Sequence, residues 1–475
     1  METIINFISS IVFFNVLGVF GVDSLNLPFA IFVILVGYVF IAVKLNGVQF
    51  TRFGTCLRYT FGKQKKDETK SDNGEDEKIA SPLKTLFTSI ASCTGTNATA
   101  GVVFMVAVGG PGVVFWIPLI ALFSMSFRLC EVYLSHHYRA EHIDNNSFGG
   151  PFDYIKKGLA SLGFAKLGIV LTMMYTIIML SGGAIGVSMY EANQFVVVLE
   201  KGFDFLNGKR WLISVTLTIL VFIIIIGGTK RVSNVLGTIL PVVSLVYVFT
   251  CFIIIIANYD KLGDAVKLIV SDAFHPTTIA GGAVASFCMA LRKTALSHET
   301  GLGTSGIVHA MSDEKDSMKE AIRSMMTPII NSIIICMSSA FVVILTGVYK
   351  TDAAKDGMVA LTNAFGSLSG CLSWVVIIVA TLLTFNVLVG WSNYIAKCVS
   401  YITAKKWVYY VVLAVFLCCT FIGGVKDDFY LIMNLVDASV VLLAIINVPV
   451  IIALSGQVRK AIKEYDFKNK KSGSK

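Results

Sequence analysis

Eleven apolar stretches of membrane-spanning length constrain this 475-residue chain more than any other feature. A helix needs about 20 mostly apolar residues to cross a bilayer. With 55% hydrophobic and only 15% charged residues, the chain cannot hide so much apolar surface in one soluble core. The sequence therefore predicts an all-α integral membrane protein with about eleven transmembrane helices. The stretches lie near residues 27–45, 82–108, 112–135, 165–199, 211–228, 234–257, 278–310, 326–347, 370–400, 405–423 and 430–454.

The loop charges predict the orientation. With loop 44–84 in the cytoplasm, 31 of the 39 Lys and Arg residues fall on the inner side and 8 on the outer side, as the positive-inside rule requires. We therefore expect a multi-pass protein of the plasma membrane with its N-terminus outside and its C-terminus in the cytoplasm. The net charge of +9 then indicates contact with anionic lipid of the bilayer and not with nucleic acid.

Three further segments flank these stretches. Residues 1–26 are predicted to be an N-terminal interfacial segment, although residues 4–20 are apolar enough to be a twelfth span. Loop 63–81 mixes charges of both signs with almost no apolar residues, which predicts a solvated cytoplasmic loop. Residues 455–475 are predicted to form a basic cytoplasmic tail that is disordered past Tyr465.

Two polar, glycine-containing breaks interrupt the apolar stretches: TGTNATAG at 94–101 and SHETGLGTSG at 297–306. If residue range 27–45 is an extra helix, each break lies in the first helix of a five-helix half, 82–257 or 278–454. The halves then have opposite orientations, and paired breaks in inverted halves indicate a transporter with a binding site near the bilayer midplane. A kink filled by packing is the alternative.

Broken helices suit a zwitterionic solute and a cation. The N-terminus of a half-helix offers free N–H groups to a carboxylate, and unwound carbonyls can coordinate a cation. Glycine lets the backbone approach a ligand closely. The candidate substrate-binding residues at the breaks are Thr94, Gly95, Thr96, Asn97, Ser297, His298, Thr300 and Gly301.

An enzymatic function has no support in the sequence. Hydrolase, zinc-protease, nucleotide-binding and dinucleotide-binding motifs do not occur in a suitable setting. The ten cysteines form no CxxC pair or Cys/His cluster, so we expect buried thiols, no metal centre and no cofactor. Transport, if it occurs, must be driven by an ion or solute gradient.

Several motifs resemble the alanine/glycine:cation symporter family, also called sodium:alanine symporters. They are GGPGVVFW at 109–116, GGPFDYIKKGL at 149–159, HETGLGTSGIVHA at 298–310 and GWSNY at 390–394. The resemblance extends from about Val43 to Gly456. It implies a LeuT-type fold, with two inverted five-helix repeats after one extra N-terminal helix, and symport of a small neutral amino acid with sodium.

This chain departs from the family pattern at the sites for sodium. The family's Gly-Thr-Gly-Asn is here Gly95-Thr96-Asn97-Ala98, so the asparagine has moved by one residue. The family's Phe-Ser-Thr is here Phe385-Asn386-Val387, where Asn386 offers an oxygen suited to a hard cation and Val387 offers none. The resemblance thus places sodium at the positions of Asn97, Ala98, Asn386 and Val387.

A third departure puts a carboxylate at the substrate cavity. The family's Gln-Ala-Asn-Ser is here Glu191-Ala192-Asn193-Gln194. We expect Glu191, Asn193 and Trp391 to face the substrate. A glutamate within the membrane is a functional candidate by default, so Glu191 either binds a cationic group of the substrate or carries a proton, unless it lies near the outer helix end in water.

Other polar residues in the apolar stretches have structural readings. Glu299 matches a family glutamate and is expected to brace the second break, whereas His298 replaces a family asparagine. Asp437 is expected to pair with a Lys or Arg of the bundle. Glu131 and Arg139 are placed at the cytoplasmic end of their span, in solvated or structural roles.

The sequence thus predicts a secondary active transporter that couples a small amino acid such as alanine or glycine to a cation, with sodium favoured. Two alternatives stay open: a proton-coupled or ion-independent carrier or exchanger for a different, cationic substrate, and a transporter-like sensor that does not transport. The oligomeric state is not specified by the sequence.

Overall fold

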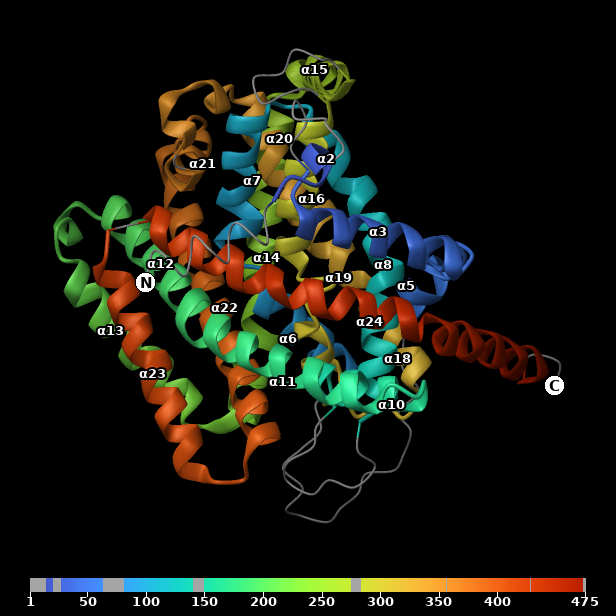
Figure 1. The fold of residues 1–475 in the computed structure, drawn as a ribbon. Coiled ribbons are helices and arrows are strands. Elements are labelled where there is room, and N and C mark those ends of the chain that lie inside the picture. The colour runs from blue at the N-terminus through green and yellow to red at the C-terminus, as the bar shows by residue number, and fades with distance from the viewer. Residues whose placement is uncertain are drawn as a thin grey trace.

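The fold is a bundle of helices. The computed structural model describes residues 14–19, 27–62, 81–139, 149–274, 283–355, 357–427 and 429–472, and these form helices without any extended strand (Figure 1). The long helices and half-helices are α3 (Phe29–Lys44), α6 (Pro82–Cys93), α7 (Thr96–Gly109), α8 (Val113–His137), α11 (Ala165–Ser181), α12 (Ser188–Gly202), α13 (Arg210–Ile225), α14 (Gly228–Ala257), α16 (Ala283–His298), α17 (Thr304–His309), α18 (Ser317–Ser324), α20 (Met337–Leu345), α22 (Gly370–Ile402), α23 (Lys406–Val425) and α24 (Phe429–Ser472).

Helices occupy all eleven predicted stretches. Within the described residues, seven helices are long and apolar enough to cross a membrane, and the bent pair α6–α7 makes an eighth if it is counted as one span. Two shorter apolar helices, α3 and α13, accompany them. The chain is therefore a multi-pass helical membrane protein, because a bilayer admits only spans that satisfy their own backbone hydrogen bonds.

Shorter helices connect the long ones or form part of a span. They are α2 (Val16–Val19), α4 (Val48–Thr51), α5 (Phe53–Phe61), α9 (Pro151–Asp153), α10 (Leu159–Ser161), α15 (Leu262–Phe274), α19 (Met326–Pro328) and α21 (Gly357–Gly366). Wider π-helical turns join α9 to α10 (η1, Tyr154–Gly158), α11 to α12 (η2, Gly182–Val187) and α19 to α20 (η5, Ile329–Cys336). Single π turns inside helices are frequent at functional sites.

The distribution of apolar side chains separates inner from outer helices. About two thirds of the most apolar window of α8 is buried, against about one third of that of α14. On α14, Leu245 and Phe249 are 70% and 68% exposed. Large apolar side chains are not exposed to water in such numbers, so this face of α14 is suited to lipid.

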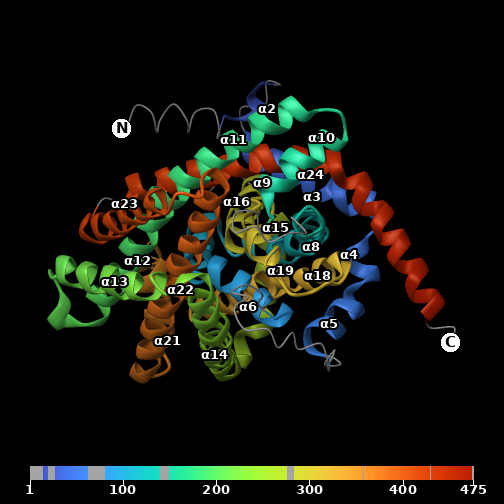
Figure 2. The ribbon, with the colours of Figure 1, turned by 90° about the horizontal axis from the view of Figure 1, so that it is seen from below.

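The C-terminal segment differs from its prediction. Helix α24 packs against α3 and α11 and continues to Ser472, where disorder past Tyr465 was expected. Its end projects from the bundle in both views (Figures 1 and 2). The hydroxyl of Tyr465 meets that of Tyr59, and Arg52 pairs with Asp466, which ties the projecting helix to the α4–α5 segment. Residues 1–13 and the loop 63–80 lie outside the described residues.

Candidate functional site at two helix breaks

The first break is shorter than predicted. Helix α6 ends at Cys93 and α7 begins at Thr96, with an angle of 44° between the two, so only Thr94 and Gly95 separate the half-helices. The polar residues from Thr96 to Gly101 are helical, because Thr and Ala can continue a helix once its first turn has formed. All of the described side chains at the break are buried, and the Thr94 hydroxyl accepts a hydrogen bond of 2.7 Å from Asn331 Nδ2.

The second break covers Glu299–Gly303, between α16 and α17. Three of its residues have positive φ angles: 53° at Glu299, 92° at Gly301 and 91° at Gly303. Glycine adopts this conformation without steric strain, whereas Glu299 does so only with support from its surroundings. The ETGLG sequence therefore unwinds the helix here.

Backbone carbonyls around the second break find side-chain donors on other helices. Unpaired backbone groups at membrane depth are costly, so these donors explain how the break is tolerated. The donors are Arg128 Nη1 to His298 O (3.3 Å), Tyr38 Oη to Thr300 O (2.8 Å), Asn447 Nδ2 to Gly301 O (2.9 Å) and Tyr175 Oη to Leu302 O (2.6 Å).

Removing one of these donors is expected to have a modest effect. Tyr38→Phe leaves the Thr300 carbonyl without its partner, and a neutral hydrogen bond contributes about 1 kcal/mol. We expect a melting temperature a few degrees lower and reduced uptake of the transported solute at equal protein amounts. Tyr259→Phe, at a side chain that is 77% exposed, is the matched control and should change neither.

Glu131 caps the half-helix after the break. Its Oε2 accepts a hydrogen bond from Gly301 N and its Oε1 accepts one from the Ser305 hydroxyl, both at 2.9 Å. A carboxylate at the N-terminus of α17 is also stabilised by the helix dipole. Glu131 is completely buried, so of its two predicted roles, solvated or structural, the solvated one is wrong.

Glu299 connects the second break to α22. Its Oε1 accepts a hydrogen bond from Trp391 Nε1 at 3.0 Å, and its Oε2 accepts one from the Thr304 hydroxyl at 2.6 Å. The indole of Trp391 therefore has its donor directed at the break. Gly183 makes room for this ring, since a Cβ there would lie 2.9 Å from it.

Glu191 lies against the first break. A Cβ on Gly95 would be 2.9 Å from Glu191 Oε1 and 2.9 Å from Val387 Cγ2, so glycine is needed at this meeting of α12 and α22 with the break. Glu191 is only 5% exposed, and its Oε2 is buried without a hydrogen-bond partner among the described residues. The reading in which this glutamate reaches water at a helix end is therefore wrong.

The other predicted residues divide into two groups. Asn193 donates to the carbonyls of Gly423 (3.4 Å) and Lys426 (2.7 Å) on the α23 side. Ser297 is buried beside Cys336, and His298 accepts a hydrogen bond from Thr300 N at its Nδ1. In contrast, a group of buried polar atoms has no partner among the described residues: Thr96 Oγ1, His298 Nε2, Thr300 Oγ1 and both amide atoms of Asn386.

The predicted sodium positions are only partly described. Ala98 and Val387 are buried and carry no side-chain oxygen, and Ala98 N donates to Gly95 O at 3.2 Å. The side chains of Asn97 and Asp437 lie outside the described residues, so the predictions made for them stay predictions.

A cavity of about 930 Å³ leads to the first break from one end of the bundle. Thr96 and Phe104 of α7 line it, together with Gln194 of α12, Lys293 of α16 and Met358 of α21. Glu200, Arg210 and Asp427 also line it and form ion pairs with one another through Arg210. We call this cavity the vestibule.

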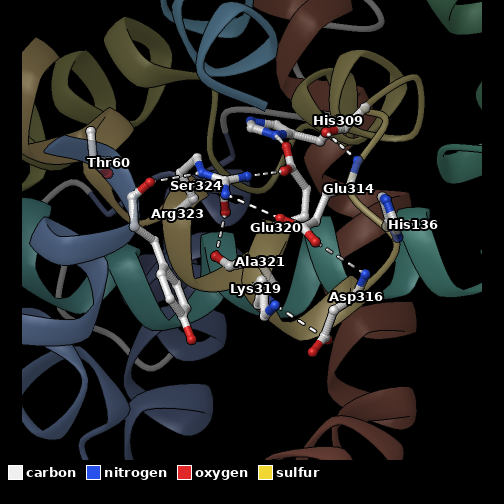
Figure 3. Close-up of polar contacts among 12 residues, drawn as sticks. Thr60, His136, His309, Glu314, Asp316, Lys319, Glu320, Ala321, Arg323 and Ser324 are labelled. Carbon is white, nitrogen blue, oxygen red and sulfur yellow. Dashed lines mark hydrogen bonds and ion pairs between the residues drawn. The ribbon is translucent and has the colours of Figure 1, made fainter. Parts of the chain in front are cut away.

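A buried ionic network joins elements beyond the second break (Figure 3). Glu320 of α18 accepts from His309 Nδ1 of α17 at 2.6 Å and from Arg323 Nη1 at 2.5 Å. Arg323 also pairs with Glu314 (3.2 Å) and donates to Tyr59 O of α5 (3.2 Å). His309 and Glu320 are completely buried and Arg323 is 3% exposed.

Arg139 secures the loop that carries Glu314. Its guanidinium donates to the carbonyls of Ala310 (3.2 Å), Ser312 (2.6 Å) and Glu314 (3.0 Å). Asp316 then caps α18 by accepting from Met318 N at 2.8 Å. The structural role of Arg139 is thus to hold the loop between α17 and α18.

The comparisons with known proteins agree with this geometry. The model of the sodium:alanine symporter family matches residues 15–475, which is nearly the whole chain. The chain belongs to the sodium:alanine symporter family. Members of this family are transporters and not enzymes, and cation-coupled amino-acid transport is accordingly the function of this symporter.

Relatives of the symporter cover most of its length. The amino-acid carrier protein AlsT of Bacillus subtilis is 28% identical over 93% of this chain and 90% of its own. The sodium/alanine symporter AgcS of Methanococcus maripaludis is 25% identical over 92% and 94%. Among solved structures, MhsT in complex with L-phenylalanine matches with a TM-score of 0.54 and 12% identity, over 78% of this chain and 89% of that one, which supports a shared LeuT-type fold.

The sequence did not single out the residues that support the breaks. Tyr38, Arg128, Tyr175 and Asn447 of the symporter lie in apolar stretches, where a lone polar residue has many readings. Arg128 was the strongest available signal, because an arginine in an apolar stretch is costly unless it meets carbonyls or carboxylates. The structure shows that it is completely buried.

Proposed function

We propose that this symporter carries a small neutral amino acid such as alanine or glycine together with sodium, by alternating access. One observation supports this most strongly: a single side chain, that of Arg128 on α8, bonds to both broken spans. Arg128 connects them, since its Nη2 donates to Ser89 of α6 (3.1 Å) and its Nη1 to His298 at the second break.

The substrate carboxylate is proposed to bind at the N-terminus of α7. Of the two half-helix N-termini, that of α17 is already occupied by Glu131, whereas the N-cap residue of α7 is Gly95, which has no side chain to cap it. Free N–H groups at a helix N-terminus suit a carboxylate. The unpartnered hydroxyls of Thr96 and Thr300 and the unpartnered Nε2 of His298 supply further polar contacts.

Sodium is proposed to bind near Asn386 of α22 and the start of α7. Hard cations prefer oxygen ligands, and the buried Asn386 amide oxygen has no partner among the described residues. Backbone carbonyls of Asn97 and Ala98 are the other candidates, whereas the Val387 side chain has no oxygen. The proposed site thus has fewer side-chain ligands than the family pattern implies.

The proposed topology has eleven spans across the plasma membrane, with the N-terminus outside the cell and the C-terminus in the cytoplasm. Helix α3 is then the extra helix, and residues 82–257 and 278–454 form the inverted halves. The vestibule opens outward in this arrangement. Lys293 lines the vestibule. In this topology its charge therefore belongs to the outer side, although the count of loop charges assigned it to the inner side.

Uptake into proteoliposomes tests this proposal. Purified protein is reconstituted, and labelled alanine, glycine and a panel of other amino acids are offered with sodium and proton gradients imposed separately. We expect an inward sodium gradient to stimulate uptake of alanine or glycine severalfold over a potassium control. Absence of amino-acid uptake under either gradient would overturn the proposal.

A further inference from the structure

Glu191 is a buried carboxylate without a counter-charge. Its Oε2 is buried without a hydrogen-bond partner among the described residues, and the residue is only 5% exposed. It lies against Gly95, in the break between α6 and α7, where an added Cβ would be 2.9 Å from Glu191 Oε1. A buried charge that is left unpaired is strongly destabilising, so this carboxyl group must either hold a proton or meet a positive charge that a bound ion or molecule supplies.

The described charged groups near Glu191 do not supply that positive charge. Glu299 is the charged group that acts on it electrostatically, and it has the same sign. Glu299 has donors of its own in Trp391 and Thr304, and it is also influenced by Arg128. The guanidinium of Arg210, on the neighbouring α13, is held by Glu200 and Asp427 in the vestibule.

The carboxyl end of α6 adds to the negative potential. Helix α6 stops at Cys93, directly before the Thr94–Gly95 break that Glu191 contacts. Thr94 N and Gly95 N bond to the carbonyls of Ile90 and Cys93, while those of Ala91 and Ser92 accept no hydrogen bond from a described residue. Free carbonyls at a helix C-terminus carry a partial negative charge and attract cations.

We propose that Glu191 and the carboxyl end of α6 together bind a monovalent cation during transport, either a sodium ion or the ammonium group of the amino acid. This inference rests on the proposed function, because it assigns a ligand within the same site. Glu191 is absent from the vestibule lining, which favours a small cation over a long cationic side chain.

The test compares the wild type with Glu191→Gln in proteoliposomes, using labelled alanine and sodium chloride as the probes. A hydrogen bond to a charged group is stronger than one to a neutral group. Loss of the carboxylate charge should therefore weaken binding of the cation roughly 10- to 100-fold. If sodium is the ligand, the half-saturating sodium concentration rises by this factor. If the ammonium group is the ligand, the half-saturating alanine concentration rises and the sodium dependence is unchanged.

Two controls separate charge from folding. Glu191→Asp keeps the carboxylate and should retain more cation affinity than Glu191→Gln. Asp264→Asn removes a carboxylate that is 86% exposed and lies 3.8 Å from Lys267 on α15, and it should leave both half-saturating concentrations unchanged. Sodium-dependent or alanine-dependent thermal stabilisation of the detergent-solubilised protein measures binding without transport.

The outcomes distinguish this inference from the proposed function. The inference would be overturned if the wild type and Glu191→Gln showed the same dependence on sodium and on alanine. It would also be overturned if Glu191→Gln changed only the response to an imposed pH gradient, because the carboxylate would then hold a proton. If the wild type takes up no amino acid, the proposed function fails. A sodium-dependent stabilisation that disappears in Glu191→Gln would still support the cation site.

Discussion

Glu131→Ala is expected to reduce amino-acid uptake to the level of empty liposomes. The substitution leaves Gly301 N–H and the Ser305 hydroxyl without partners in a completely buried place. Each unsatisfied buried group is destabilising by about 1–3 kcal/mol, and both belong to the segment that must hold its unwound shape. Uptake of labelled alanine under a sodium gradient, at equal reconstituted protein, measures the effect.

The matched variant for this prediction is Glu131→Gln. Its amide oxygen can still accept from Gly301 N–H and its amide group can donate to the Ser305 hydroxyl, so it should retain part of the uptake. The remaining loss reports the charge at the N-terminus of α17, which stabilises that end by up to about 2 kcal/mol when buried. Near-normal uptake by Glu131→Ala would show that the capped geometry is not needed.

Glu320→Leu is expected to destabilise the protein by about 3–5 kcal/mol, since removing one member of a buried ion pair leaves the other charge uncompensated. Glu320 accepts from both His309 and Arg323, so its loss affects α17 and α18 together. The measurement is the thermal unfolding midpoint of the detergent-solubilised protein, followed by size-exclusion chromatography after heating.

An exposed ion pair provides the control for this second prediction. Lys460 and Glu464 lie 4.0 Å apart on α24 with side chains that are 81% and 60% exposed. Such pairs contribute about 0.3–0.5 kcal/mol, so Glu464→Leu should leave the unfolding midpoint nearly unchanged. Equal shifts for the two substitutions would mean that the buried network contributes no more than a surface pair.

Apolar length and the two polar breaks predicted most of the fold. Helices occupy all the predicted stretches because the requirement for about 20 apolar residues leaves few alternatives. The extent of the first break was overestimated, since the polar residues Thr96 and Thr99 can lie on a helix as readily as in an unwound segment. The second break was located well because Gly301 and Gly303 both adopt positive φ.

The contacts that support the breaks could not be predicted from the sequence. Tyr38 and Thr300, for example, are 262 residues apart, and the spacing of apolar residues on one helix says nothing about such a pair. The burial of Glu131 was not predicted for a related reason: its place along the span does not say what packs beside it. The position of α17 beside α8 decides its burial.

Helix α17 has only six residues and is attached at both ends by glutamates of other helices. Glu131 of α8 holds its first turn through Ser305 and the preceding Gly301, and Glu320 of α18 holds its last residue, His309. A rotation of α17 alone would separate at least one of these buried pairs. The half-helix is therefore mechanically coupled to α8 and α18, and we expect the three to turn as one rigid unit, with the bending concentrated at Gly301 and Gly303.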